Sequence, residues 1–203
     1  MARAFAKIAF TPGVQAVQTR MGSRHAYRSV DMGESEAVAL TSFETEFIRS
    51  RDSFYQGTVG ENGWPYVQHR GGPIGFLKVL DARTIGYADF SGNRQYISVG
   101  NLEGDARVSL FLMDYPGQRR LKIWGHARLI DKDSEPALIA RLASPDYPAR
   151  IERGVLITVD AFDWNCPKFI TPRFTERELN ALVDDGLGQP APRRQRGGAG
   201  PHG

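Results

Sequence analysis

The sequence has little cysteine, little histidine and no long apolar run, and each shortage excludes a class of protein. Cys166 is the single cysteine, which rules out an intramolecular disulfide and a multi-cysteine zinc or iron–sulfur site. The four histidines show no His-x-x-x-His spacing of the kind that binds zinc. No segment reaches the roughly 20 apolar residues that span a bilayer, and the N-terminus lacks the apolar stretch of a signal peptide. These absences predict a cytoplasmic protein without a membrane partner.

The excess of one sign of charge is also small, because the chain has 26 basic and 23 acidic residues. Three of the arginines, Arg193, Arg194 and Arg196, stand in a Gly/Pro-rich tail, so the rest of the chain is close to neutral. This balance argues against a nucleic-acid partner. A Gly-x-Gly-x-x-Gly fingerprint and a Gly-x-x-x-x-Gly-Lys-Ser/Thr loop are both missing, which removes the main support for dinucleotide-binding and P-loop folds.

What the chain does contain indicates one turn-rich domain with extensions. Its 203 residues are 41% hydrophobic and include 22 glycines and 12 prolines, which favours a mainly β or α+β protein over a helical bundle. Residues 1–33 are broken by proline and glycine and predict an irregular arm. We expect the domain itself at 34–186 and a disordered tail at 187–203.

Hydrophobic periodicity predicts the elements of this domain. An amphipathic helix is expected over 34–51, and a hairpin follows, because Asn62-Gly63 separates two alternating strands at 54–59 and 66–70. Gly71-Gly72-Pro73 breaks the second strand before it resumes. The remaining expected strands are 74–80, 84–90, 107–113, 119–130 and 155–162, and the remaining helices are 96–103, 134–142 with Ser134 as N-cap, and 175–183 with Thr175 and Glu178 in a capping box. Strands joined by short turns predict a six-stranded antiparallel barrel with a few flanking helices.

Two polar features stand out against this framework. The loop at 89–95, rich in Gly, Asn and Ser, carries Arg94 between two apolar strands. In the strand 119–130, alternation places five basic or aromatic side chains on one face: Arg120, Lys122, Trp124, His126 and Arg128. Cationic groups around a polar loop predict a site for a phosphorylated, aromatic ligand.

The ordered motifs of residues 54–130 resemble a known family. They are Thr58-Val59-Gly60-Glu61-Asn62-Gly63-Trp64-Pro65-Tyr66, Gly75-Phe76-Leu77-Lys78-Val79-Leu80-Asp81, Gly92-Asn93-Arg94-Gln95, Arg107-Val108-Ser109-Leu110-Phe111 and Arg119-Arg120-Leu121-Lys122-Ile123-Trp124-Gly125. This set is similar to the pyridoxamine 5'-phosphate oxidase-like family, the FMN-binding split β-barrels, and within it to the branch of flavin-nucleotide-binding proteins. The resemblance implies a six-stranded antiparallel split β-barrel and a homodimer with FMN at the subunit interface.

The resemblance also implies residue roles. Arg94, flanked by Asn93 and Gln95, would hold the FMN phosphate through its bidentate guanidinium. Gln95 stands where the family prefers lysine, and Arg120 stands where a glutamine often contacts the flavin. The complete implied cofactor set is Lys78, Arg94, Asn93, Gln95, Arg120 and Lys122, with backbone groups of Leu77 and Phe90 at the ring.

The expected function is therefore an FMN-dependent oxidoreductase acting on a small-molecule redox substrate. The vitamin B6 reaction itself is not expected, because no substrate-binding segment follows Trp164. No catalytic residue is identified, although a histidine general base stays open. Three alternatives remain: a flavin carrier without turnover, a split barrel that binds heme or a deazaflavin, and an interaction module that binds neither.

Overall fold

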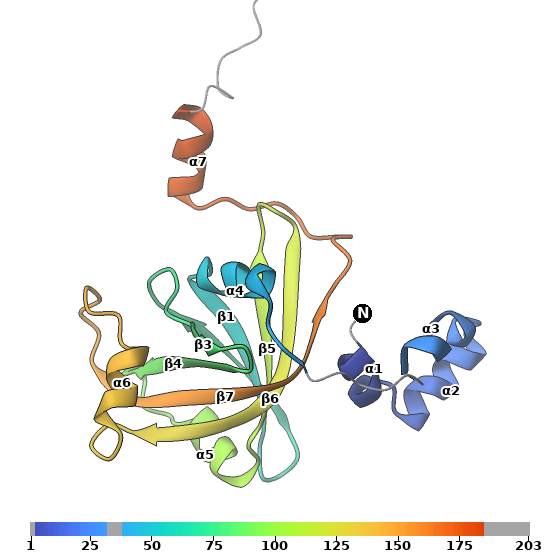
Figure 1. Ribbon diagram of the computed structural model, residues 1–203, viewed down its shortest axis with the longest axis horizontal. Helices are drawn as coiled ribbons and strands as arrows, with labels where there is room; N and C mark the ends of the chain where they lie inside the picture. Colours follow the sequence, from blue (N-terminus) through green and yellow to red (C-terminus); the bar gives the residue numbers. More distant parts are fainter. Residues whose placement is uncertain (1–2, 32–37, 185–203) are drawn as a thin grey trace, which may run out of the picture.

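One antiparallel sheet of seven strands, curled into a split barrel, organises the structure. The computed structural model describes residues 3–31 and 38–184. The strand order across the sheet is β2-β1-β5-β6-β7-β4-β3 (Figure 1). Its strands are β1 Ser53–Val59, β2 Pro65–Gly71, β3 Lys78–Asp81, β4 Thr84–Phe90, β5 Arg107–Asp114, β6 Arg119–Asp131 and β7 Ile151–Trp164. The predicted mainly β, α+β class and the antiparallel split barrel are confirmed.

The sheet has one strand more than the six expected, and the break at Gly71-Gly72-Pro73 explains the difference. The chain does not resume the same strand after this break. Instead β2 pairs with β1 at one edge, whereas β3 pairs with β4 at the opposite edge. Residues between them form a turn against the preceding helix, where Gly75 has a φ of 74° and its N–H donates to the Arg51 carbonyl at 3.0 Å. This turn also makes β3 shorter than the expected strand 74–80.

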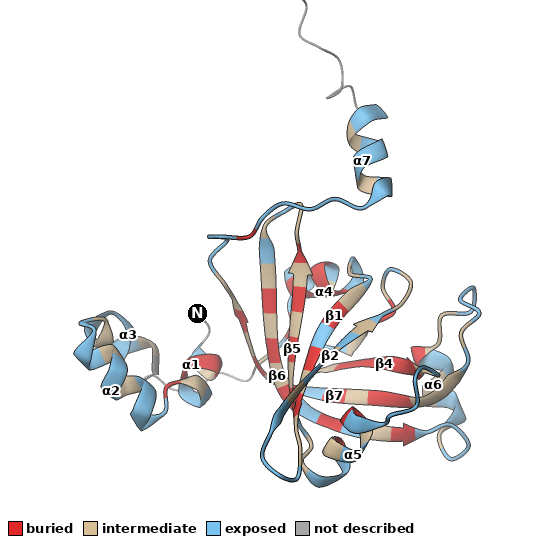
Figure 2. Cartoon of the chain, turned by 180° about the vertical axis from the view of Figure 1, so that it is seen from behind, coloured by how far each residue is buried: buried red, intermediate tan, exposed pale blue. Residues whose placement is uncertain are grey.

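The core lies inside the barrel and comes from alternate residues of each strand. Leu110, Leu121, Ile123 and Ile157 are fully buried. Along the central strands β5 and β6, buried residues alternate with more exposed ones (Figure 2). The predicted hairpin forms in register around Gly63, whose φ of 81° suits glycine. Because side chains alternate with a period of two, this register fixes which residues face the core.

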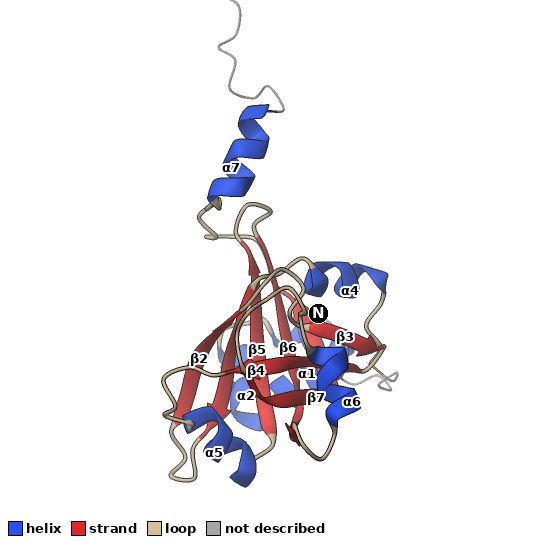
Figure 3. Ribbon diagram, turned by 90° about the vertical axis from the view of Figure 1, so that its left-hand side faces the viewer, coloured by secondary structure: helices blue, strands red, loops and turns tan. Residues whose placement is uncertain are grey.

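Four helices accompany the barrel: α4 Ser42–Arg49, α5 Ile97–Gly104, α6 Pro136–Leu142 and α7 Glu176–Leu182. The predicted capping box of Thr175 and Glu178 at α7 is confirmed. Ser134 does not cap α6, because the helix begins two residues later with Glu135 as a cap that makes no side-chain hydrogen bond. Helix α7 projects beyond the barrel (Figure 3).

The N-terminal arm differs from the irregular segment that was expected. It forms three helices, α1 Arg3–Ala9, α2 Pro12–Arg20 and α3 Arg24–Asp31, beside the barrel (Figure 1). Pro12 does not break this arm, because it stands in the first turn of α2 behind the N-cap Thr11. Phe5 is buried and stacks on Trp124 with ring centroids 4.4 Å apart, which docks α1 on the barrel.

The division into an arm at 1–33, a domain at 34–186 and a tail at 187–203 stays a prediction, and the tail lies outside the described residues. Within the described ranges, no helix combines the length and the apolar character needed to cross a membrane.

Candidate functional site

The loop after β4 adopts a backbone that its sequence does not favour. Arg94 and Tyr96 have φ values of 60° and 54°, a left-handed conformation that costs a residue other than glycine about 1–2 kcal/mol. The loop is held by side chains: the Gln95 N–H donates to Asn93 Oδ1 at 3.2 Å, and Arg94 Nε donates to the Tyr96 hydroxyl at 3.3 Å. Strain of this kind, maintained by surrounding contacts, gathers at binding sites.

A network of buried charge lies beneath this loop. Arg70 of β2 donates to Asp89 at 2.6 Å, and Arg153 of β7 donates to the other oxygen of the same carboxylate at 3.3 Å. Burial raises the pKa of Asp89, although both arginines oppose that shift. The network therefore ties the edge strand β2 to β4 and β7 next to the loop.

A small hollow opens between the loop and this network. We call it the Arg94 hollow; its volume is about 190 Å³, and it is lined by Gln68, Arg70, Phe90, Arg94, Ser98 and Glu152, among others. Glu152 accepts hydrogen bonds from Ser91 and Tyr96 and so holds the loop to β7. The hollow thus gathers residues from β2, β4, β7 and α5.

Two features of the Arg94 hollow fit a phosphate group. The Nε–H of Arg70 is buried and has no acceptor among the described residues, and a buried unpaired donor costs about 1–3 kcal/mol. Helix α5 begins at this hollow, and its N-cap Tyr96 makes no side-chain cap hydrogen bond. The first N–H groups of a helix attract anions. An anion in the hollow would therefore lie beside the Arg70 side chain and the first N–H groups of α5.

The structure separates the predicted cofactor residues into three places. Asn93, Arg94 and Gln95 are exposed together in the loop, next to the half-buried Phe90. Lys78 lines a different hollow with Arg49 and Arg141, and the preceding Leu77 is fully buried in the core. Lys78 pairs with Gly86, four residues before Phe90 along β4, which at 3.3 Å per residue is about 13 Å. A single phosphate does not span both places.

The third place is the outer face of β6, which proves not to be a free cationic surface. Arg120 donates to the Cys166 carbonyl at 3.1 Å, and Lys122 lies 3.9 Å from Asp163 and over the Phe5 ring. Further along the strand, Arg128 pairs with Glu135. The predicted alternation is confirmed, but these side chains already have partners in β7, in α1 and in the segments that follow β6 and β7. The sequence alone did not reveal those partners.

Sequence reasoning missed Arg70, Gln68 and Ser98. A signal was present, since Tyr66, Gln68 and Arg70 alternate along β2 and therefore share a face. The alternation does not predict which elements pack against this face of β2, because β4 and α5 approach it only in the folded barrel. Ser98 donates to Gln68 at 2.8 Å across this junction.

Residues 40–163 match the model of the pyridoxamine 5'-phosphate oxidase family. A comparison with curated proteins finds no match. HupZ of Group A Streptococcus shares the fold at 12% identity with a TM-score of 0.50, over 66% of this chain and all (100%) of that one. A histidine-to-alanine variant of HupZ aligns at 14% identity with a TM-score of 0.50, over 62% and 99% of the two chains.

A more distant structure, an FMN-binding protein from Syntrophomonas wolfei, aligns at 13% identity with a TM-score of 0.43 over 76% of this chain and 95% of that one.

Proposed function

The chain belongs to the pyridoxamine 5'-phosphate oxidase family, and on this premise we propose that it binds FMN and acts as an FMN-dependent oxidoreductase on a small-molecule substrate. The observation that carries the proposal is the Arg94 hollow, where a buried Arg70 donor without an acceptor among the described residues meets the uncapped start of α5. A phosphate group in the hollow would balance the charge of the Arg70 side chain and accept from the first N–H groups of α5. A bound flavin supplies reversible hydride or electron transfer, so the protein needs to provide binding and orientation.

In this proposal different residues contact different parts of the cofactor. Arg94 and Arg70 bind the phosphate, and Asn93 and Gln95 hold the loop in its strained form. Phe90 and Leu77 offer backbone groups to the ring. Because Lys78 lies outside the Arg94 hollow, we assign it to the ring of the cofactor rather than to its phosphate. Arg120 and Lys122 are engaged on the outer face of β6 by the Cys166 carbonyl and Asp163, so the proposal gives them no contact with the phosphate or the ring.

The visible absorption spectrum of the purified protein, recorded before and after addition of FMN, tests this proposal first. We expect flavin absorption bands that stay with the protein through gel filtration. A strong Soret band would replace FMN by heme, and a colourless protein that leaves added FMN free would overturn the proposal. Turnover with electron donors and acceptors then separates an enzyme from a flavin carrier.

Removal of the loop arginine is expected to weaken the binding of FMN. Arg94→Ala deletes a charge-assisted hydrogen bond to phosphate, which predicts a loss of about 1.5–3 kcal/mol in binding free energy. Fluorescence titration of FMN measures this loss. Arg83→Ala is the matched control, because Arg83 precedes the far end of β4 and the substitution removes the same charge. Equal affinities of the two variants for FMN would contradict the assignment of phosphate binding to Arg94.

We also propose a homodimer with the cofactor at the subunit interface. The Arg94 hollow, at about 190 Å³, is smaller than the roughly 300–1,000 Å³ of sites that enclose a small molecule. A second copy would supply the remaining cover for the ring. Light scattering is expected to give twice the 22.5 kDa of one chain. A monomeric mass with FMN still bound would contradict the shared site.

A further inference from the structure

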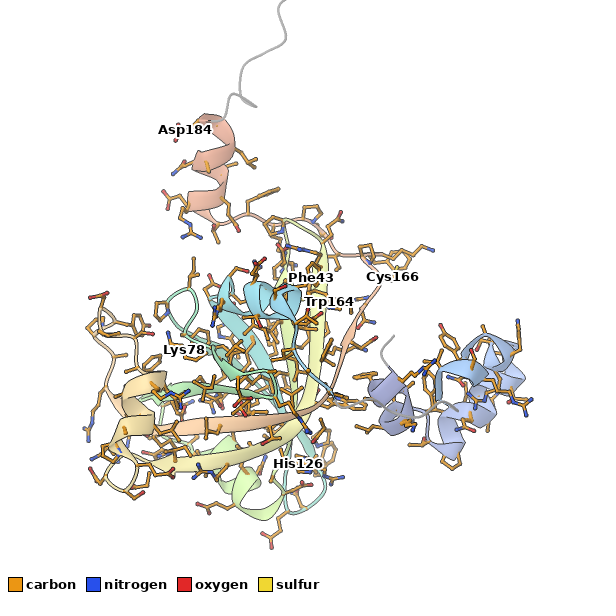
Figure 4. The ribbon with its side chains drawn as sticks, viewed as in Figure 1. Phe43, Lys78, His126, Trp164, Cys166 and Asp184 are labelled. Atoms are coloured by element: carbon orange, nitrogen blue, oxygen red, sulfur yellow. The ribbon has the colours of Figure 1, made fainter. Side chains whose placement is uncertain are left out.

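A further hollow lies between the tip of the β1–β2 hairpin and helix α5. We call it the hairpin hollow; its volume is about 510 Å³, and its lining includes Glu61, Asn62, Trp64, Tyr66, Ile97 and Asn101. This volume is within the roughly 300–1,000 Å³ of small-molecule sites. Figure 4 shows the hairpin and α5 at the end of the barrel away from Trp164 and Cys166.

The hairpin hollow is separate from the Arg94 hollow, although both lie between β2 and α5. Tyr66 and Gln68 share a face of β2, and Tyr66 lines the hairpin hollow whereas Gln68 lines the Arg94 hollow. The two sets of lining residues do not overlap. A substitution in one hollow therefore removes no lining residue of the other.

Hydrogen bonds hold the walls of the hairpin hollow in place. The Gly60 N–H donates to the Trp64 carbonyl at 2.9 Å, and the Trp64 N–H donates to Asn62 Oδ1 at 3.2 Å, which fixes the turn. On the other side, Asn101 of α5 donates to the Thr58 hydroxyl of β1 at 2.9 Å. Because the helix and the turn are both tied to β1, a ligand has little of the wall to order when it binds.

Large apolar side chains of this hollow face solvent. Trp64 is 74% exposed and Ile97 is 41% exposed. A single exposed apolar residue is ordinary in a folded protein, but these two line one hollow together with Tyr66. Apolar side chains that gather inside a polar rim mark a binding site, and Asn62 and Asn101 supply that rim here.

The charge of the hairpin hollow is negative. Glu61 is the one charged residue among the described residues that line it, and it has no ion pair within the part of the chain that the structure describes. Arg70, farther along the same face of β2, is engaged by Asp89. An indole face and a carboxylate both attract positive charge, so this combination selects a cation.

We propose that the hairpin hollow binds an alkylated organic ammonium ion. Its positive charge lies by the Trp64 ring and the Glu61 carboxylate, and its alkyl groups lie against Ile97 and Tyr66. Alkyl groups on the nitrogen cover the exposed apolar walls, which a hydrated inorganic cation does not do. Binding is reversible, and no covalent bond forms or breaks. The site is independent of the FMN proposal, because it uses none of the residues that line the Arg94 hollow.

The probe for this site is choline, and its neutral counterpart is 3,3-dimethylbutan-1-ol, in which carbon replaces the charged nitrogen at the same shape. Each compound gives one sharp NMR signal from its equivalent methyl groups, so the same line-broadening titration measures both dissociation constants. Choline is expected to bind the wild-type protein about tenfold more tightly than the alcohol, because the ring face and the carboxylate act on the charge alone.

Two substitutions separate the contributions of the carboxylate and the ring. Glu61→Gln keeps the size of the side chain without its charge, and should weaken choline binding about threefold while leaving that of the alcohol unchanged. Trp64→Leu keeps an apolar side chain without the ring face, and should also weaken choline binding. Both positions are exposed, so both variants should fold like the wild type.

Glu103→Gln is the matched control, because Glu103 is an exposed glutamate of α5 that does not line the hollow. It should bind choline as the wild type does. The proposal is overturned if choline and the alcohol bind with equal affinity, or if either Glu61→Gln or Trp64→Leu binds choline like the wild type. It is equally overturned if the wild type binds no choline, including the case in which a second copy covers the hollow. FMN affinity should be the same in all these variants, so failure here leaves the FMN proposal untouched.

Discussion

Replacement of Arg70 by methionine is expected to lower the free energy of unfolding by about 3 kcal/mol, the lower end of the range for removing one partner of a buried ion pair. The side chains of Arg70 and Asp89 are only 15% and 7% exposed. Methionine fills similar space but leaves the carboxylate with Arg153 alone, at 3.3 Å. Urea denaturation followed by tryptophan fluorescence measures the loss.

This destabilisation should depend on pH in a defined direction. Burial already raises the pKa of Asp89, and removal of Arg70 removes the stronger of the two arginine interactions that lower this pKa. An acid whose folded-state pKa lies above its unfolded value contributes stability that is present at low pH and lost as pH rises through the folded pKa. The deficit of Arg70→Met relative to the wild type should therefore be small near pH 4 and larger at neutral pH.

Arg128→Met is the control for the Arg70 experiment. Arg128 also pairs with a carboxylate, that of Glu135, but the two side chains are 57% and 37% exposed, and such surface pairs contribute about 0–1 kcal/mol. A similar loss in both variants, or a deficit of Arg70→Met that does not change with pH, would contradict the role assigned to the buried network. The double variant Arg70→Met with Asp89→Asn should recover part of the loss, because the carboxylate left without Arg70 is then no longer charged.

Substitution of Gly125 by alanine is expected to cost about 3 kcal/mol, the upper end of the usual range for overpacking. A Cβ at this position would overlap the carbonyl oxygen of Thr158 on β7. That oxygen belongs to the backbone of a paired strand, so it cannot move without disturbing the β6–β7 ladder. Thermal and urea denaturation report the loss.

Gly100→Ala is the matched control for Gly125→Ala. Gly100 is an exposed residue within α5, and an added Cβ there meets nothing within 4 Å. Since alanine is the better helix former by about 1 kcal/mol, this variant should be neutral or slightly more stable. An equal effect of the two substitutions would show that β6 and β7 adjust to the added methyl group and that the β-bulge beside Gly125 is not tightly packed.

Local patterns of the sequence predicted much of the fold. Alternation in 107–113 and 119–130 identified the central strands β5 and β6, and Asn62-Gly63 identified the hairpin. Thr175 and Glu178 marked the start of α7. These features depend on residues that are close along the chain, so their physical causes, side-chain period and local hydrogen bonds, are present in the sequence itself.

The Arg94 loop shows the limit of such reasoning for the site. Its composition singled it out, and its neighbours Asn93 and Gln95 bond to each other as a local motif can. Arg70 was missed because its partner Asp89 is 19 residues away and Arg153 is 64 residues beyond that partner. Only the pairing of β4 with β7, and the packing of β2 beside them, brings the three together.

The sequence by itself therefore determined the strands, the turns and the polar loop, because each arises from interactions within a few residues. The tertiary structure decided which charges are free. Asp163 and Glu135 pair with basic residues on the outer face of β6. Phe5 of α1 stacks on Trp124 and so docks the N-terminal arm on the barrel. A bulge in β7 places Asp160 next to His126. All three depend on strand register and on packing between distant segments, which no local pattern encodes.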